Sequence, residues 1–588
     1  MVSNRPFTVG NQPPWTALAI QEDMKPSLET NISEVDKITR AQELKDFIVE
    51  IAVDIGELEQ FYNVSLSATR VQRLGEYVSQ HANTLVTRFA PIDGLTQDAK
   101  VDWLLIHAWI GNKLRTLRTE WTQLNDLKPL LGDWVPGLVD LCERRQKVIP
   151  TEGKYAGQVL SDAIKAVDTL SAEIQSGKFK MEDNRFGAYR AALQLEDLEK
   201  NLTEWYGFYS GYDPLFTWWT SKPWHDFSQK LVSFIAVIRQ YLVGIKPGDE
   251  DAIVGQPISK EGIDAELLTE FVAYSPEEII QIGEKQYKWC EKEAIKASRE
   301  MGFGDDWRKA QEKVKNMYVE PGQQTNMVHE LAQEAVDYVE KYDMVTLPEI
   351  AKECWRTFMM TPERQKVNPF FLGGNEIIVS YPTDTMSHED KLMVMRGNNR
   401  PFSRSTVFHE LLPGHHLQYH YMARSKQHRN MFQTPFWIEG WSFYWELILW
   451  DHGFPGTPEN RLGMLFWHMH RCARIVFSLN FHLGKWTPQQ CIDYLVEKVG
   501  HERATAEGEV RRSFNGDYGA LYQAGYMLGA LQLYALRKEF LDTGKMMEKE
   551  FHDRVMKENN MPIELLRALL KGEKLEAGQR PSWKFYDL

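Results

Sequence analysis

Residues 406–418 read TVFHELLPGHHLQ and bring three histidines and one glutamate within eight positions. The stretch begins like the zinc-peptidase pattern HExxH, in which two histidines on one helical face bind zinc and the glutamate acts as general base. Here Pro413 stands where that pattern has its second histidine. On a regular helix His415 would lie about 240° around the axis from His409, so the two side chains would point apart.

The proline and glycine inside this stretch predict that the helix is interrupted. Pro413 cannot donate a hydrogen bond to the carbonyl of His409, and its ring clashes there. Gly414 gives the next peptide unusual backbone freedom. A two-residue bulge at this point would bring His415 back to the place of the second ligand. We therefore expect His409 and His415 to bind one zinc ion, with Glu410 as the general base.

A catalytic zinc site also needs a third protein ligand and an open position. The segment EGWSFYWE at 439–446 offers two glutamates. Glu439 follows His415 by 24 residues, which leaves room for one helix, a loop and the start of a second helix. A carboxylate on the facing helix is the usual third ligand in glutamate-type zinc peptidases. We therefore expect Glu439 as the third ligand, with Glu446 as the alternative.

The chain outside this stretch is long and rich in apolar residues. Its 588 residues, of which 43% are hydrophobic, are too many for one ordinary core, so we expect two lobes. A segment rich in proline, glycine and acidic residues at 246–262 predicts the boundary. The expected division is an N-terminal helical lobe at 1–250 and a catalytic helical lobe at 251–588.

Most of the sequence has the apolar spacing of helices, so the expected fold class is mostly α. Ser275 followed by Pro276 predicts a helix start, because serine is a good N-cap and proline fits the first helical turn. The clearest strand signal is NEIIVSY at 375–381, which follows two glycines and precedes a proline.

Charge and cysteine content exclude several classes of protein. A net charge of −14 argues against a nucleic-acid partner, which requires a basic surface. Five cysteines without CxxC spacing favour a reducing compartment. Residues 1–18 contain no apolar signal segment, and the apolar stretch at 462–483 carries arginines and histidines that make it too polar to span a membrane. We expect a cytoplasmic protein without a membrane partner, and leave open whether it forms a homodimer.

Several motifs together resemble one known family, the domain-of-unknown-function 885 family. Its members carry an HExxPGH motif and are similar to zinc metallopeptidases of the thimet-oligopeptidase and carboxypeptidase Taq types. The resemblance runs from about residue 368 to residue 568 and rests on GGNEIIVSYPTD at 373–384, HELLPGHHLQ at 409–418, EGWSFYWE at 439–446 and LYQAGYMLGALQ at 521–532.

The resemblance implies a large, saddle-like helical body with a small edge sheet beside a deep active-site channel. It implies one zinc ion per chain, held by His409, His415 and Glu439, with Glu410 as catalytic base. Related peptidases use a tyrosine late in the sequence to stabilise the negative charge that develops on the substrate oxygen. Tyr526 is the first candidate for this role and Tyr522 the alternative. Tyr522 is also a candidate for substrate binding.

Further residues are candidates for substrate binding. Arg511 or Arg512 could pair a substrate carboxylate in bidentate fashion, or form a structural ion pair with nearby acids. His416 is a candidate for substrate binding or for orienting the ligands. Arg471 and Arg474 lie in an apolar helix, where buried arginines usually find carboxylate partners, so we expect a structural role for them.

The expected function is zinc-dependent hydrolysis of peptide or amide bonds, acting on short peptides. One alternative is a zinc amidase that acts on a small metabolite in a biosynthetic pathway. A second is a non-catalytic binding protein, which would not need Glu410 as a base. A third is an iron or manganese enzyme, because two histidines and one carboxylate also bind iron in oxygenases.

Overall fold

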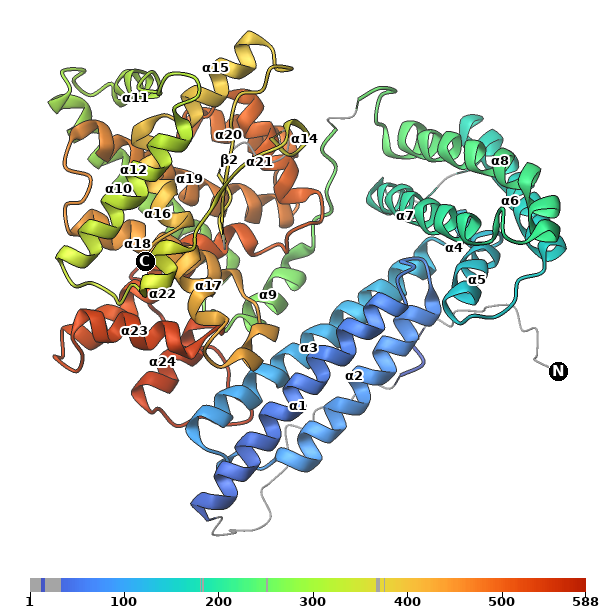
Figure 1. Cartoon of the computed structure of the whole chain (residues 1–588), viewed down its shortest axis with the longest axis horizontal. Helices are drawn as coiled ribbons and strands as arrows, with labels where there is room; N and C mark the ends of the chain where they lie inside the picture. Colours follow the sequence, from blue (N-terminus) through green and yellow to red (C-terminus); the bar gives the residue numbers. More distant parts are fainter. Residues whose placement is uncertain are drawn as a thin grey trace. The chain divides into compact units, whose positions relative to one another are not determined.

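The computed structural model describes residues 12–15, 33–179, 181, 185–249, 252–365, 371–374 and 376–588. It divides into two compact units, each drawn in Figure 1. The first comprises Met1–Thr96 and Ile106–Val254, and the second comprises Gln97–Leu105 and Gly255–Leu588. Helices make up most of both units, so the prediction of a mostly α fold is confirmed.

The described residues of the first unit form helices and connecting loops, without a strand. Helix α3 (Gln97–Asp126) begins in the second unit and continues in the first. The other helices of the first unit are α1 (Glu34–Phe61), α2 (Ala68–Phe89), η1 (Ile92–Gly94), α4 (Lys128–Leu131), α5 (Val135–Gln146), α6 (Gly153–Gln175), α7 (Arg185–Tyr209), α8 (Pro214–Val237) and η2 (Ile238–Val243).

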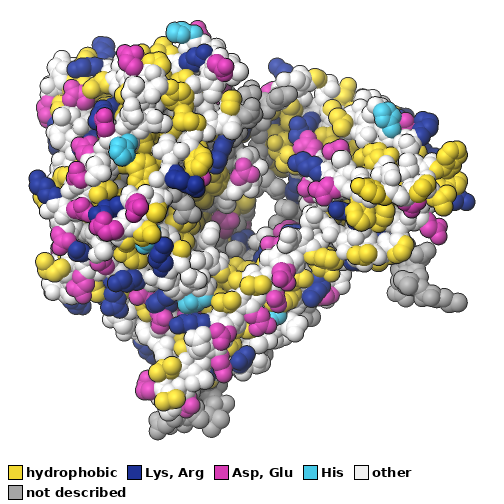
Figure 2. Space-filling view, in the orientation of Figure 1, with side chains coloured by type: hydrophobic (Ala, Val, Ile, Leu, Met, Phe, Trp, Pro, Cys, Tyr) yellow, Lys and Arg dark blue, Asp and Glu magenta, His cyan; other side chains and the backbone are white. Residues whose placement is uncertain are grey.

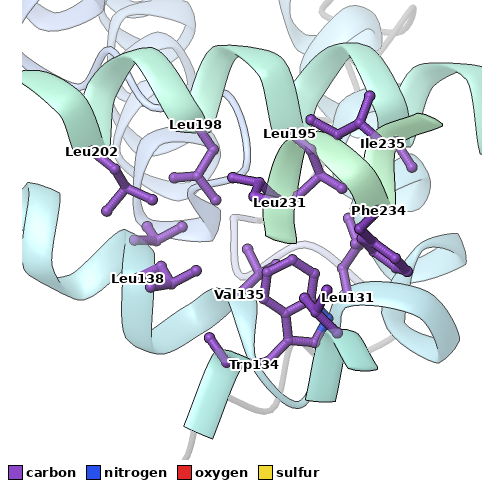
Figure 3. Close-up of a cluster of buried hydrophobic side chains, with 14 of the residues drawn as sticks. Leu131, Trp134, Val135, Leu138, Leu195, Leu198, Leu202, Leu231, Phe234 and Ile235 are labelled. Carbon is purple, nitrogen blue, oxygen red and sulfur yellow. The ribbon is translucent and has the colours of Figure 1, made fainter. Parts of the chain in front are cut away.

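The core of the first unit follows from apolar residues at helical spacing. On α7, Leu195, Leu198 and Leu202 recur at intervals of three and four positions and are buried. Figure 3 shows them with the residues of the same cluster from α4, α5, α8 and the intervening turn: Leu131, Trp134, Val135, Leu138, Leu231, Phe234 and Ile235. None of the predicted zinc ligands lies in this unit, because all three belong to the second.

The second unit contains the remaining helices and a two-stranded parallel sheet. The strands are β1 (Thr357–Met359) and β2 (Ile377–Val379). The helices are α9 (Ser259–Thr269), α10 (Pro276–Glu300), α11 (Trp307–Lys315), α12 (Gln324–Lys341), α13 (Glu349–Glu353), α14 (Pro362–Gln365), α15 (His388–Gly397), α16 (Arg400–Glu410), α17 (His415–Met422), η3 (Gln427–Met431), α18 (Pro435–Asp451), α19 (Pro458–His482), α20 (Pro488–Val499), α21 (Arg503–Phe514), α22 (Tyr522–Leu541), α23 (Glu548–Glu558) and α24 (Ile563–Lys571).

The start of α10 and the extent of β2 were both predicted from the sequence. Helix α10 starts where Ser275 and Pro276 predict it, and Ser275 forms a capping box with Glu278. The predicted strand at 375–381 is shorter in the structure, where β2 covers Ile377–Val379. Asn375 lies outside the described residues.

Helix α19 is the central helix of the second unit. Every residue from Leu462 to His482 is buried, including Arg471 and Arg474. Its neighbours include α10, α16, α20 and α22. The apolar stretch at 462–483 is therefore a buried helix of the protein core. Across the described residues, no helix combines the length and the apolar character that a bilayer crossing requires.

Helices α18 and α22 approach each other unusually closely because glycines line their contact. A Cβ atom on Gly529 would lie 2.0 Å from the carbonyl oxygen of Phe436. One on Gly440 would lie 2.7 Å from the Cα atom of Gly529, and one on Gly525 would lie 2.8 Å from the Cβ atom of Pro435. This close contact sets the distance between the side chains that α18 and α22 carry into the candidate site.

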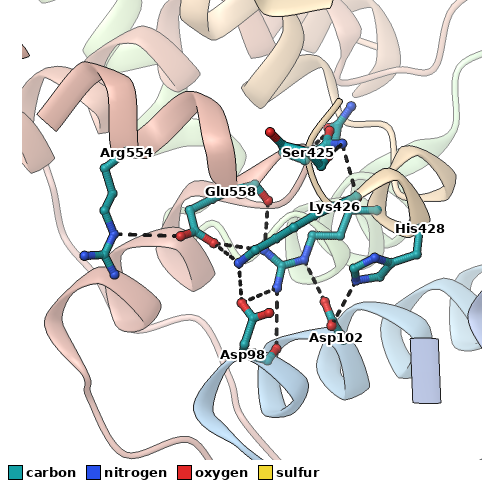
Figure 4. Close-up of polar contacts among 10 residues, drawn as sticks. Asp98, Asp102, Ser425, Lys426, His428, Arg554 and Glu558 are labelled. Carbon is teal, nitrogen blue, oxygen red and sulfur yellow. Dashed lines mark hydrogen bonds and ion pairs between the residues drawn. The ribbon is translucent and has the colours of Figure 1, made fainter. Parts of the chain in front are cut away.

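A buried ion network explains why residues 97–105 belong to the second unit (Figure 4). Arg429 on η3 is fully buried. Its Nε atom donates to Asp102 over 2.6 Å, and its Nη2 atom donates to Asp98 over 2.8 Å. Its Nη1 atom donates to the backbone carbonyl of Glu558 over 2.8 Å. The start of α3 is thereby bound to η3 and to the end of α23.

Candidate metal centre

The helix that carries the histidines is broken where the sequence predicts it. Helix α16 ends at Glu410 and α17 begins at His415. Between them, Leu411 has left the helical conformation, with φ −107° and ψ −109°. The rings of His409 and His415 consequently lie with their centroids 5.0 Å apart, nearly perpendicular to each other.

Gly414 makes this break possible. A Cβ atom at this position would lie 1.9 Å from the carbonyl oxygen of His409, so any side chain would clash with the backbone. The Gly414 N–H donates to the carbonyl of Phe408 over 3.0 Å. From α18, Trp441 donates its indole N–H to the carbonyl of Pro413 over 2.9 Å. Polar groups freed by the break are thus paired within the fold.

Two imidazoles and one carboxylate converge beside the break. Oε2 of Glu439 lies 3.2 Å from Nε2 of His415 and 3.6 Å from Nε2 of His409. Two ligands of a tetrahedral zinc ion, each bonded at 2.0–2.1 Å, are about 3.3 Å apart. All three residues are buried. The donor set and its spacing therefore fit a zinc ion with three protein ligands.

A second group of side chains has comparable spacing. Cys290, His468 and Cys472 also bring potential ligand atoms within 4.8 Å of one another, between α10 and α19. None of the three is among the residues that line the pocket described below. The pocket contains His409, His415 and Glu439 together with Glu410, so we place the candidate centre at these three residues.

Glu446 holds His409 from the side opposite Glu439. Its Oε1 atom lies 2.8 Å from Nδ1 of His409, and its Oε2 atom accepts a hydrogen bond from Ser405 over 2.9 Å. A carboxylate on Nδ1 places the ring proton there and leaves Nε2 with a free lone pair toward Glu439. Glu446, the alternative ligand, is thus positioned to orient His409, and Glu439 has the geometry of the third ligand.

Tyr522 fixes the other oxygen of Glu439. Its hydroxyl donates a short hydrogen bond to Oε1, which leaves Oε2 facing the two imidazoles. This contact joins α22 to α18 across the glycine-lined interface. The sequence predicted Tyr522 as a substrate-binding or oxyanion-stabilising residue, and the structure places it against the candidate ligand.

Glu410 borders the same pocket and is closely covered by the segment before β2. A Cβ atom on Gly373 would lie 2.1 Å from Oε2 of Glu410 and 2.8 Å from its Cα atom, so this approach requires glycine. Burial raises the pKa of Glu410, while His409 and His415 oppose the increase. The carboxyl group is therefore held in a confined position beside the candidate centre.

The pocket has a volume of about 530 Å³ and is lined largely by α16–α19, α21 and α22. The candidate ligands, Glu410, Tyr522 and Tyr526 all contribute to its surface. The ring of Tyr526 stacks against that of His409, with centroids 6.2 Å apart. The Cζ atoms of Arg474 and Arg471 lie 4.4 and 4.8 Å from the centroid of the same Tyr526 ring.

Comparison with known proteins now adds the family. A family model described as "Bacterial protein of unknown function (DUF885)" matches residues 264–570. The chain belongs to this family. A comparison with curated proteins finds no match. The similarity to thimet-oligopeptidase-type enzymes stays a prediction from the sequence.

Two solved structures resemble this DUF885 chain. One is a "putative lipoprotein of unknown function" from Shewanella oneidensis, with a TM-score of 0.64, 16% identity, and coverage of 90% of this chain and 99% of that chain. The other is a "putative lipoprotein" from Colwellia psychrerythraea, with a TM-score of 0.57, 16% identity, and coverage of 91% and 99%. At this identity the likeness shows the fold alone.

The remaining predicted residues of the DUF885 chain are distributed unevenly around the pocket. Arg512 lines it, whereas Arg511 and His416 are not among its lining residues. The ring nitrogens of His416 lie 3.0 Å from the carbonyl of Ala351 and 3.3 Å from that of Gly374. His416 therefore connects α17 to α13 and to the loop that covers Glu410, because its ring lies between their backbones.

Other residues that line the pocket or support its ligands in this DUF885 member were not singled out from the sequence. Tyr419 lines the pocket and lies four positions after His415, so helical spacing could have identified it. Ser405 lies four positions before His409 on the same helix and could have been found likewise. Gly373 and Trp441 act through contacts between distant segments, for which the sequence gives no spacing signal.

Proposed function

We propose that this DUF885 protein is a zinc-dependent hydrolase of peptide or amide bonds. The observation that carries the proposal is the convergence of His409 Nε2, His415 Nε2 and Glu439 Oε2 at the spacing of a tetrahedral zinc site. Glu410, next to the first ligand, lines the same pocket. Its position supports hydrolysis, because a site that only binds metal does not need a confined carboxylate beside it.

In the proposed reaction, an amide and water become a carboxylic acid and an amine. His409, His415 and Glu439 would hold a zinc ion, which would supply a Lewis acid to polarise the substrate carbonyl and to lower the pKa of water. Glu410 takes a proton from the attacking water molecule and delivers it to the leaving nitrogen as the carbon–nitrogen bond breaks. Tyr526, on the pocket wall beside His409, is the proposed donor to the substrate oxygen that becomes negative.

One feature supports short substrates, and another supports a reducing compartment. A pocket of about 530 Å³ accommodates a few residues of a peptide. All five cysteines are unpaired, which supports the proposed cytoplasmic location.

The test combines metal analysis with one substitution. Purified protein is expected to contain about one zinc per chain. Glu410→Gln is expected to retain that zinc and to lower the turnover of a mixed peptide library, followed by mass spectrometry, by at least about 1000-fold. Glu353→Gln makes the same chemical change at an exposed position and should leave the zinc content and the turnover unchanged. Full turnover by Glu410→Gln would contradict the proposal.

A further inference from the structure

Three arginines form one wall of the candidate pocket. Arg471 and Arg474 come from α19 and Arg512 comes from α21. All three line the pocket that contains the candidate zinc ligands, and they are only 4%, 2% and 6% exposed. Buried guanidinium groups need partners for their N–H donors, so their hydrogen bonds can be accounted for individually.

Several of these N–H groups have no partner within the described residues. Arg474 donates from Nε to Glu509 over 2.6 Å, but its buried Nη1 is unpaired. Arg512 donates from Nη2 to the hydroxyl of Tyr518 over 3.1 Å, but its buried Nε is unpaired. Arg471 has an unpaired buried Nε and an ion pair at 3.6 Å, too long for a hydrogen bond.

The nearby carboxylates do not balance the three positive charges. Glu509 is paired with Arg474. Glu446, the ion-pair partner of Arg471, is already bonded to His409 and Ser405. Desolvation lowers the pKa of Arg471 by more than the nearby Glu446 raises it.

The positive charge of the arginine wall contrasts with the net negative charge of the whole chain. The sequence carries a net charge of −14, and acidic and basic side chains are intermingled over the face drawn in Figure 2. Within the pocket, the two carboxylates Glu410 and Glu439 belong to the proposed zinc centre. The arginine wall is thus left with positive charge and free donors, which is what a bound anion would use.

The contacts of Tyr526 relate the arginine wall to the proposed zinc centre. The ring of Tyr526 lies against that of His409 and is also close to the guanidinium groups of Arg471 and Arg474. An extended peptide advances about 3.3–3.6 Å per residue. An anion bound to the arginines would therefore lie within about three residues of an amide held at the proposed zinc centre.

We propose that Arg471, Arg474 and Arg512 bind a carboxylate of the substrate, within about three residues of the amide that is cleaved. This inference rests on the proposed hydrolase function and names its substrate class: short peptides or acylated amino acids with a carboxylate near the reacting bond. The carboxylate can come from a free C-terminus or from an Asp or Glu side chain. Guanidinium groups suit it because their planar donors bind carboxylates in bidentate fashion.

Matched substrates test the class directly. A peptide library is prepared with free C-termini and with C-terminal amides, and its Asp and Glu residues are replaced by Asn and Gln in a parallel set. Loss of the required carboxylate should lower kcat/KM by about 100-fold. A loss on amidation assigns the C-terminus, and a loss in the Asn and Gln set assigns a side chain. Equal cleavage of all sets overturns the carboxylate subsite and leaves the hydrolase proposal standing.

A binding measurement tests the arginines independently of turnover. The full-length protein is titrated calorimetrically with hippurate and with its neutral amide, hippuramide. Wild-type protein should bind hippurate at least about tenfold more tightly. Arg471→Gln should abolish that preference, whereas Arg471→Lys should restore part of it, because lysine keeps the charge without the planar fork. The exposed Arg424→Gln variant should behave as wild type.

Arg471 is chosen because, unlike Arg474 and Arg512, its side chain forms no hydrogen bond to another described residue, so its variant should remain folded. If Arg471→Gln does not fold, the substrate sets and the wild-type comparison of hippurate with hippuramide still decide. Equal affinity of wild-type protein for the two ligands, or an unchanged preference in folded Arg471→Gln, overturns the proposal.

Discussion

At the scale of single residues, the candidate centre depends on side chains that orient the ligands. Glu446 fixes the ring of His409 through Nδ1, and Tyr522 fixes Glu439 through Oε1. Such partners determine which atom of a ligand is available to the metal. The proposed centre therefore extends to α22 and to the second half of α18.

Glu446→Gln should weaken zinc binding without removing a ligand. The amide keeps the size of the side chain but loses the charge that favours the proton on Nδ1 of His409. We expect a 10- to 100-fold loss of zinc affinity, measured by competition with a fluorescent chelator. Glu353→Gln is again the matched control. An unchanged affinity would show that Glu446 does not orient His409.

Gly373→Ala should affect the base and not the metal. The added methyl group would lie 2.1 Å from Oε2 and 2.8 Å from the Cα atom of Glu410, so the side chain alone cannot avoid it. We expect kcat/KM to fall by at least about tenfold while the zinc content stays the same. Gly397→Ala places a methyl group in open space and should retain full activity.

Much of the centre could be predicted at this scale, and part of it could not. The types and spacing of His409, Glu410 and His415 suffice to predict an interrupted helix, because Pro413 and Gly414 act locally. The role of Glu446 was not predictable, since both glutamates of EGWSFYWE lie on one helix and only the packing decides which faces Nε2. The placement of His416 depends in the same way on the distant loop that it contacts.

At the scale of elements, the geometry of the site follows from the close contact of α18 with α22. Gly440, Gly525 and Gly529 allow the two backbones to touch. The contact brings Tyr522 within hydrogen-bond distance of Glu439. The sequence predicted a mostly helical chain, but it did not indicate which face of α22 meets α18.

Gly529→Ala should destabilise this contact. The new Cβ atom would lie 2.0 Å from the carbonyl oxygen of Phe436, and neither backbone can move without shifting its helix. We expect the free energy of unfolding to fall by about 1–3 kcal/mol, measured with urea. Gly111→Ala, in α3 with open space around it, should instead stabilise by about 0.5–1 kcal/mol. Equal effects of the two substitutions would contradict the role of the close contact.

At the scale of the whole molecule, the division into units does not follow the chain order strictly. Length and composition predicted two lobes with a boundary near residue 250, and the units divide at Val254 and Gly255. Residues 97–105 belong to the second unit although they open a helix that continues into the first. The sequence could not predict this, because the assignment depends on Arg429, more than 300 positions away.

The ion pair of Asp102 with Arg429 should make stability depend on pH. Burial opposes the ionisation of Asp102, but Arg429 and His428 lower its pKa to about 2. Because this pKa is lower in the folded than in the unfolded chain, the stabilisation is complete above about pH 4 and is lost as the pH falls toward 2. Asp102→Asn should lower the free energy of unfolding by about 3 kcal/mol at pH 7.

The difference between wild-type protein and Asp102→Asn should shrink as the pH falls from 4 to 2, measured by urea unfolding at each pH. The exposed Asp264→Asn variant should show little difference from wild type at any pH. A difference between wild type and Asp102→Asn that does not vary with pH would count against the ion pair.

The central claim is that His409, His415 and Glu439 together bind one zinc ion, and X-ray absorption at the zinc edge of the purified protein tests it most directly. If these three residues bind it, the zinc ion should have only nitrogen and oxygen neighbours, near 2.0–2.1 Å, with the outer-shell signature of two imidazoles. A sulfur neighbour near 2.3 Å would place the metal at Cys290, His468 and Cys472 instead. That result, or a protein purified without zinc that does not take it up, would contradict the account.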